Sequence, residues 1–136
     1  MNKNEDSIIK ELLNNYRHIA IIGLSNKIER ASYKVANYLL KQKFIIYPVH
    51  PNISLWDGQK VYKTLSQIDH PIEIVNIFRN SNAILALVDQ ILAIKPKVVW
   101  LQLGIKNEEA RSVFESSGIT VIEDRCIKIE HQKINS

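Results

Sequence analysis

Residues 19–32 read Ile-Ala-Ile-Ile-Gly-Leu-Ser-Asn-Lys-Ile-Glu-Arg-Ala-Ser, and this order of residue types indicates a strand, a loop and a helix start. The four apolar residues at 19–22 suit a buried strand, and helical periodicity begins after Ser32. A buried strand that leads through a polar loop into a helix is the first half of a βαβ unit. We therefore expect a parallel sheet.

Four more apolar runs rich in Ile and Val follow, and the starts of all five lie about 20 to 30 residues apart, as in βαβ units. Segments with helical periodicity separate most of them, and residues 8–16 form another amphipathic segment. Between the second and third runs, only 64–68 looks helical, and weakly. The five predicted strands are Ile19–Ile22, Phe44–Val49, Glu73–Phe78, Val98–Leu103 and Ile119–Ile122.

These elements predict one α/β domain over residues 1–136, with a doubly wound, five-stranded parallel sheet and helices on both faces. Residues 1–15 are expected to contain an N-terminal helix and residues 124–136 to form a C-terminal tail. Right-handed crossovers favour the strand order 3-2-1-4-5. A ligand is then expected where the winding reverses, between the first and fourth strands.

Composition narrows the class of protein. The chain has a net charge of +4, scattered basic residues and one cysteine, Cys126. An internal disulfide is excluded, and neither nucleic-acid binding nor a metal site is expected. No apolar run approaches the roughly 18 residues of a membrane span, and the polar start lacks the features of a signal peptide, so we expect a cytoplasmic protein.

The loop from Gly23 to Ser32 is a candidate phosphate site. Free N–H groups at a helix start attract anions, Lys27 and Arg30 add positive charge, and Ser25 and Ser32 add hydroxyl donors. The alternative is an ordinary solvated loop with a serine cap. Because ligands of such sheets lie beyond the carboxyl ends of the strands, other strand ends become candidates too, namely Pro48–Pro51, Phe78 and Arg79, and Gln102–Gly104.

Two common nucleotide motifs are absent from this loop. A dinucleotide fingerprint would need glycines at positions 25 and 28, where Ser25 and Ile28 stand, and residues 43–53 contain no acid to bind a ribose. No Gly-Lys-Ser/Thr sequence of a P-loop occurs either. NAD(P) is therefore the alternative ligand, and an ATPase is not expected.

Several motifs together resemble the small bacterial CoA-binding proteins, a free-standing version of the CoA-binding domain of the succinyl-CoA synthetase alpha subunit. The resemblance covers roughly residues 16–132. Its motifs are Gly-Leu-Ser at 23–25, Arg30 with Ser32-Tyr33, Pro-Val-x-Pro-Asn at 48–52, Gly58-x-Lys60-Val61-Tyr62, Val-Val-Trp-Leu-Gln-Leu-Gly-Ile at 98–105, Asn107-Glu108-Glu109-Ala110, and Asp124-Arg125-Cys126 with Lys128–His131.

The resemblance implies a Rossmann-like fold that binds coenzyme A. It places Gly23, Ser25, Lys27, Arg30, Ser32 and Tyr33 on the phosphate side, and Val49, His50, Pro51, Phe78 and Arg79 on the adenosine side. Two positions depart from the family's usual residues, since His50 stands where Asn is frequent and Ala31 where Pro is frequent. The first departure puts the ribose or base contacts in doubt.

Catalytic chemistry has little support in the sequence. Gln102 and Gly104 are candidate site residues by their position, and Cys126 is a further candidate. A Cys126 thiolate beside Arg125 or His131 could react with a thioester or disulfide. The favoured alternative for Cys126 is a small thiol packed at a strand end. Trp56 either lines the rim of the site or packs under its loop. A non-catalytic binding module is thus expected, and the alternatives are a nicotinamide oxidoreductase or an acyl-CoA-handling enzyme completed by a partner chain.

Overall fold

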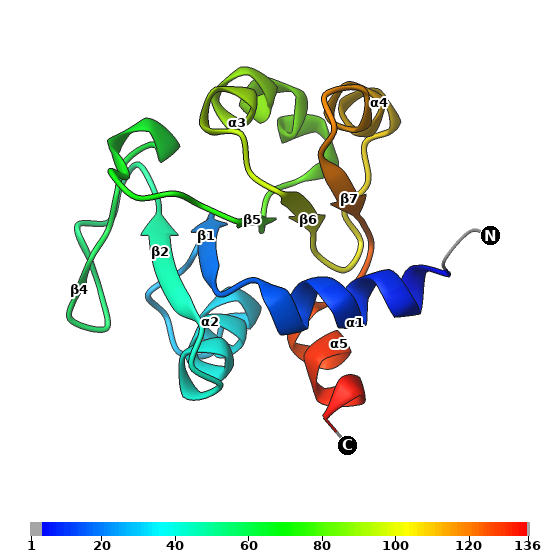
Figure 1. The fold of residues 1–136 in the computed structure, drawn as a ribbon. Coiled ribbons are helices and arrows are strands. Elements are labelled where there is room, and N and C mark those ends of the chain that lie inside the picture. Colours follow the sequence, from blue (N-terminus) through cyan, green and yellow to red (C-terminus); the bar gives the residue numbers. More distant parts are fainter. Residues whose placement is uncertain (1–3, 136) are drawn as a thin grey trace.

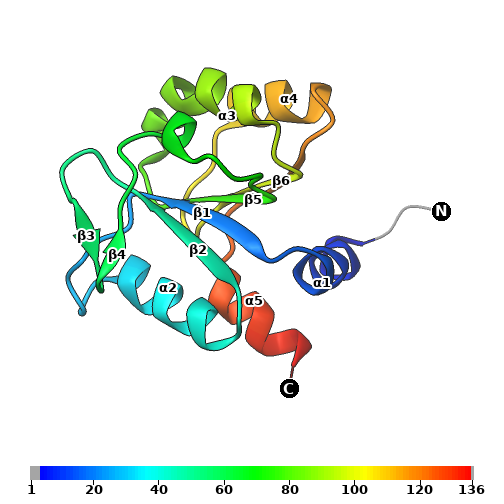
Figure 2. The same ribbon diagram turned by 60° about the vertical axis from the view of Figure 1, so that its left-hand side comes forward.

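A computed structural model describes residues 4–135 and contains a five-stranded parallel sheet between two layers of helices (Figure 1). This confirms the predicted α/β class. The strands of the sheet are β1 (His18–Ile22), β2 (Ile45–Val49), β5 (Ile74–Ile77), β6 (Val98–Leu101) and β7 (Thr120–Ile122). A separate two-stranded hairpin, β3 (Leu55–Trp56) and β4 (Gln59–Lys60), projects beside β2 (Figure 2).

The strand order is β2-β1-β5-β6-β7, so the predicted order 3-2-1-4-5 is wrong for the third predicted strand. That strand, β5, pairs with β1, as Ile19 with Ile74 and Ile22 with Ile77, instead of lying beyond β2. The reason is the face that each connection covers. The chain passes from β1 to β2 over one face and from β2 to β5 over the other, and right-handed crossovers on opposite faces run in opposite directions. The winding therefore reverses between β1 and β5.

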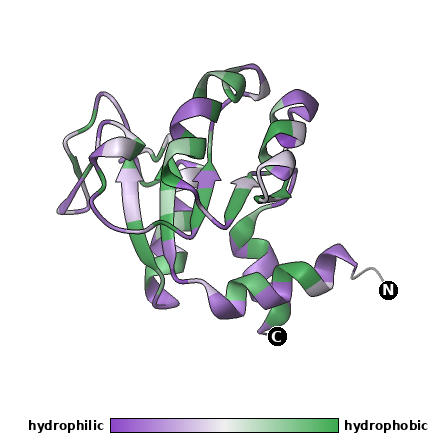
Figure 3. Cartoon of the chain, turned by 45° about the horizontal axis from the view of Figure 1, so that its top comes forward, coloured by the Kyte–Doolittle hydropathy of each residue, from purple (hydrophilic) through white to green (hydrophobic). Residues whose placement is uncertain are grey.

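Helices of both layers bury the apolar faces of the sheet (Figures 1 and 2). One face carries α1 (Glu5–Asn15), α2 (Ala31–Lys41) and α5 (Ile127–Ile134). The other carries α3 (Val88–Ile94), α4 (Glu108–Ser116) and the short 3₁₀ turn Leu65–Gln67. Hydrophobic residues dominate the central strands, as buried parallel strands require (Figure 3).

The segment between β5 and β6 is less regular than its periodicity suggests. It starts as two 3₁₀ turns, Ser81–Ala83 and Leu85–Leu87, before α3 begins. Ile84, Val88 and Ile91 are nevertheless buried, so the apolar pattern marked the packed face correctly even though it did not distinguish the helix types.

Residues 124–136, expected to form a tail, contain the helix α5, which packs against α1 and α2. Arg125 joins α1 to α5 through ion pairs with Glu5 at 2.8 Å, Asp6 at 2.9 Å and the buried Glu130 at 3.1 Å. Across residues 4–135, every helix falls short of the length and apolar character that a membrane crossing requires.

Candidate functional site

An open pocket of about 400 Å³ lies where the winding of the sheet reverses, at the carboxyl ends of β1 and β5. This is the crevice in which ligands of open α/β sheets bind. Seven of its eight lining residues are among those predicted for the site. The lining consists of Gly23, Ser25, Lys27, Arg30, Ala31, Ser32, His50 and Phe78.

Gly23 brings the ends of the two strands close together. Its φ is 84°, and a Cβ atom built on it would lie 2.4 Å from the backbone oxygen of Phe78. Its N–H donates to the Val49 oxygen at 3.0 Å, which also ties it to β2. Only glycine combines this positive φ with so close an approach of another backbone. The glycine therefore shapes the crevice rather than simply allowing a turn.

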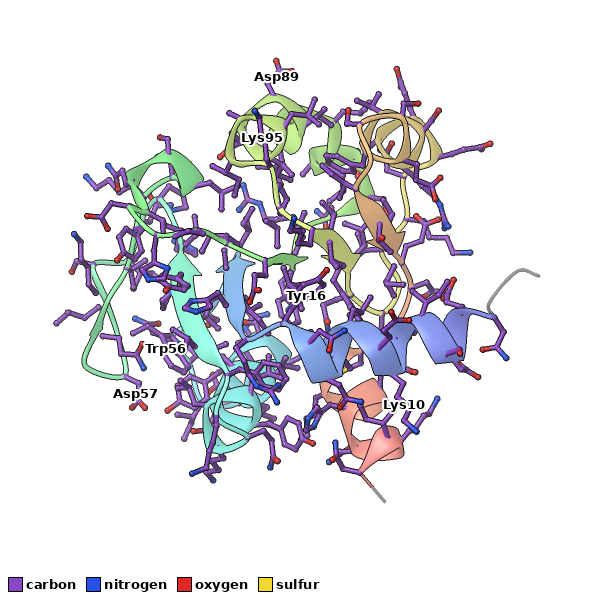
Figure 4. All side chains as sticks on the ribbon, in the orientation of Figure 1. Lys10, Tyr16, Trp56, Asp57, Asp89 and Lys95 are labelled. Atoms are coloured by element: carbon purple, nitrogen blue, oxygen red, sulfur yellow. The ribbon has the colours of Figure 1, made fainter. Side chains whose placement is uncertain are left out.

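Hydrogen bonds within the loop after β1 fix its shape. The Ser25 N–H donates to Ser32 Oγ at 2.9 Å, and the Lys27 N–H donates to Ser25 Oγ at 3.1 Å. Trp56 is fully buried, and its Nε1–H donates to the Ser25 oxygen at 2.9 Å. Trp56 thus packs under the loop and does not line the rim of the site. Figure 4 shows Trp56 and Asp57 on the projecting hairpin. These bonds hold the loop in a defined conformation.

The start of α2 lacks a side-chain cap. Its N-cap residue is Arg30, which makes no side-chain capping bond, whereas Asn4 caps α1 and Asn107 caps α4. Ser32 is buried inside the first turn and is occupied with Ser25, so it does not cap the helix. The first turn of an 11-residue helix therefore faces the pocket region with uncapped N–H groups, between the exposed cations Lys27 and Arg30. This arrangement attracts an anion.

His50 adds a neutral donor to the pocket. Burial lowers the pKa of the His50 imidazole below its ordinary value, and the positive charge of Arg79 lowers it further. Its Nδ1 accepts the Asn52 N–H at 3.0 Å, so the neutral ring carries its proton on Nε2. A bound anion nearby would raise this pKa again.

Four predicted residues border the pocket without lining it. Val49 is buried at the end of β2, and Pro51 lies exposed in the turn that follows. Arg79 is exposed, with its Cδ 3.2 Å from the Cβ position built on Gly23. Tyr33 faces a neighbouring groove instead, because it follows Ser32 around the first turn of α2.

The other three predicted residues lie farther along the sheet edge and have structural partners. Gln102 is buried and accepts the Ile127 N–H at 3.1 Å, so it holds the start of α5. Gly104 donates its N–H to Asp124 at 2.7 Å. Cys126 is the half-buried N-cap residue of α5 and packs against the core. The pocket does not bring these three together with the loop.

Two residues were not predicted as site residues from the sequence. Ala31 lines the pocket, but an alanine carries no chemical signal. Asn76 is fully buried in β5 between Ile21 and Trp100, and its side-chain nitrogen and oxygen have no hydrogen-bond partner among residues 4–135. A polar residue inside the apolar run Ile74–Ile77 is the signal that could have identified it.

The fold and the pocket together define a doubly wound α/β domain with an open pocket at its topological switch point, lined in part by the cations Lys27 and Arg30. A family model described as a CoA binding domain matches residues 17–132. The chain belongs to this CoA-binding domain family. The match covers nearly the same residues as the resemblance found in the sequence.

Relatives extend over most of the chain. The uncharacterized protein YneT of Bacillus subtilis (strain 168) is 39% identical over 123 residues, which cover 90% of this chain and 91% of YneT. A hypothetical protein from Pyrococcus horikoshii OT3 has a TM-score of 0.93 and 31% identity, with all of both chains covered.

A larger enzyme contains the same fold. The dinucleotide forming acetyl-coenzyme A synthetase 1 of Ca. Korarchaeum cryptofilum, in complex with phosphate and ADP, matches with a TM-score of 0.72 and 22% identity. The match covers 84% of this chain but 27% of that one. At this identity the likeness concerns the fold alone.

Proposed function

We propose that this protein binds coenzyme A, or an acyl-CoA, with the phosphates in the pocket at the start of α2. The observation that carries the proposal is the uncapped first turn of α2, which meets Lys27 and Arg30 in one pocket. Each phosphate there can accept hydrogen bonds from backbone N–H groups and charge-assisted bonds from the two cations. Membership of the CoA-binding domain family supports the choice of ligand.

The adenosine end is assigned to the side of the pocket formed by β2 and β5. Phe78 lines this side, and neutral His50 offers an Nε2–H donor to ribose or phosphate oxygens. Arg79 and Pro51 border this side. Val49 contributes through the backbone bond to Gly23 rather than by side-chain contact.

NAD(P) is the weaker alternative on the same residues. A dinucleotide site uses an acid at the end of the second strand to bind the ribose diol. Here β2 ends at Val49 and is followed by His50, and residues 43–53 include no Asp or Glu. The additional phosphate of CoA also gives the two loop cations more negative charge to bind.

A binding role is preferred to catalysis on the chemistry of the lining. The eight lining residues include no carboxylate and no thiol, and among them His50 is the side chain that could act as a base near neutral pH. Cys126 lies outside the lining. An acyl-CoA-handling enzyme would thus need groups from a partner chain, whereas cofactor-dependent turnover by the isolated protein would support a nicotinamide oxidoreductase.

Isothermal titration calorimetry of the purified protein with CoA and with NAD tests the proposal. We expect tighter binding of CoA, and dephospho-CoA should lie between CoA and NAD. Equal or tighter binding of NAD would reverse the assignment. Mass spectrometry of ligand released from protein purified without added cofactor identifies what the protein carries and whether an acyl group is attached.

A further inference from the structure

A second concave surface lies on the outer side of α2, next to the ligand pocket. We call it the basic groove and define it by Ile28, Tyr33, Lys34, Tyr38, Lys41 and Lys128. Loop residue Ile28 forms one end, α2 forms the floor, and α5 contributes Lys128. The groove shares no lining residue with the ligand pocket.

A carboxylate borders the groove at Tyr33, whose hydroxyl donates to Asp57 at 3.5 Å, but the lysines of the groove have no ion-pair partner. Three of its residues are lysines and none is acidic, and Lys34, Lys41 and Lys128 form no ion pair with any residue between 4 and 135. Lys128 instead lies over the ring of Tyr38, at 5.7 Å from its centre. Three lysines on one concave surface attract an anionic partner.

The groove also has an apolar and aromatic component. Ile28 is 67% exposed although it belongs to a loop whose backbone is fixed by hydrogen bonds. Tyr33 packs against Trp56 with a ring separation of 5.1 Å, and Tyr38 hydrogen-bonds to His131 at 2.7 Å. Both tyrosine rings are therefore positioned before any partner binds, which is typical of residues that anchor protein interfaces.

We propose that the basic groove binds an acidic segment of a partner protein, which places an apolar side chain on Ile28 and carboxylates against the three lysines. A concave surface with unpaired lysines and rigid tyrosines complements such a segment in shape and charge. A membrane would require more exposed apolar side chains than Ile28 alone, and a nucleic acid would require a longer basic stripe.

The position of the groove connects partner binding to the ligand. Tyr33 packs against Trp56, and the Trp56 Nε1–H donates to the Ser25 oxygen in the loop after β1. Ile28 belongs to the same loop. A partner in the groove would therefore contact the segment proposed to bind the CoA phosphates. The proposal nevertheless stands independently of the ligand's identity, because the groove has its own lining.

A fluorescein-labelled, glutamate-rich peptide with two central leucines is a direct probe, measured by fluorescence anisotropy at low and at physiological salt. The matched variants are Lys34→Glu with Lys41→Glu in the groove, and Lys10→Glu with Lys63→Glu at exposed positions elsewhere. Figure 4 shows Lys10 on α1. We expect the groove variant to bind the peptide at least about tenfold more weakly and the control variant to bind it nearly as wild type does.

A second pair of variants tests the apolar contact. Ile28→Ser should weaken peptide binding, whereas Leu85→Ser, at another exposed apolar residue on the opposite face of the sheet, should not. Circular dichroism of all variants checks the fold. If a lysine-to-glutamate variant fails to fold, the corresponding Lys→Gln version replaces it.

Three results would overturn the proposal. The first is an equal loss of peptide binding in both charge variants, which would indicate unspecific attraction. The second is tighter binding to phosphatidylglycerol vesicles or single-stranded DNA than to the peptide, with the same dependence on Lys34 and Lys41. The third is loss of CoA binding in Lys34→Glu with Lys41→Glu, which would make the groove part of the ligand pocket. Failure of CoA to bind at all would refute the proposed function and leave the peptide result standing.

Discussion

Replacing Gly23 with alanine would place a methyl group 2.4 Å from the Phe78 backbone oxygen while the residue keeps a φ of 84°. The left-handed conformation alone costs an L-residue about 1 to 2 kcal/mol. Relieving the contact requires a shift of the β5 backbone, for which overpacking values of about 1 to 3 kcal/mol are appropriate. We therefore expect the free energy of unfolding to fall by about 2 to 5 kcal/mol.

Gly118→Ala is the matched control for this change. Gly118 has a φ of 82°, but a Cβ built on it meets nothing within 4 Å. It should lose only the conformational part, about 1 to 2 kcal/mol. Urea unfolding followed by circular dichroism gives both values, and Gly23→Ala should also weaken CoA binding because Gly23 and Phe78 line the pocket. Equal destabilisation by the two substitutions would refute the close approach of β1 and β5.

Three further substitutions test separate parts of the account. Arg30→Ala should lower CoA affinity about ten- to one hundred-fold, as expected for loss of a charge-assisted hydrogen bond, and should leave the free energy of unfolding unchanged. Lys63→Ala should leave CoA affinity intact. Calorimetry that finds no difference between the two variants would place Arg30 on the solvated surface. Cys126→Ser should bind reduced CoA as wild type does, and neither protein should gain the mass of one CoA from CoA disulfide; a reductant-sensitive gain confined to wild type would show that the thiol reaches the ligand. Burial lowers the pKa of His131 from its ordinary value of 6.5, and the charge of Arg17 lowers it further. Wild type should therefore lose stability as pH falls below 6.5, because the unfolded chain then binds more protons than the folded one. His131→Gln should remove part of this dependence of the free energy of unfolding on pH, measured by urea unfolding at several pH values.

The positions of the strands could be predicted from the sequence because helices bury both faces of the sheet, so its strands are apolar. Each of the five predicted strands contains an observed strand or most of one, since buried parallel strands appear as short Ile- and Val-rich runs. The predicted strand order is wrong at β5 because residues 50–73, which connect β2 to β5, contain a hairpin and one short 3₁₀ turn instead of a helix. Such a connection has no helical periodicity to show which face of the sheet it covers.

The pocket was predictable where position and composition agreed. The loop after β1 follows from the βαβ pattern, and Lys27 and Arg30 stand in it. The resemblance places Tyr33 on the phosphate side, whereas the structure places it in the lining of the basic groove, and the direction of side chains around the first turn of α2 cannot be predicted from the motif. Gln102 lies at the expected edge of the sheet, but its bond to the start of α5 depends on a helix that the sequence did not indicate.

A titration of ¹⁵N-labelled protein with CoA, followed by ¹H–¹⁵N correlation spectra, measures both binding and its location. The proposed site predicts the largest shifts for backbone amides of residues 23–33, with further changes at His50 and Phe78, and little change in α4 and at the N-terminal ends of the strands. Saturating shifts centred on another part of the chain, or none at CoA concentrations well above those in cells, would contradict a CoA site at the start of α2.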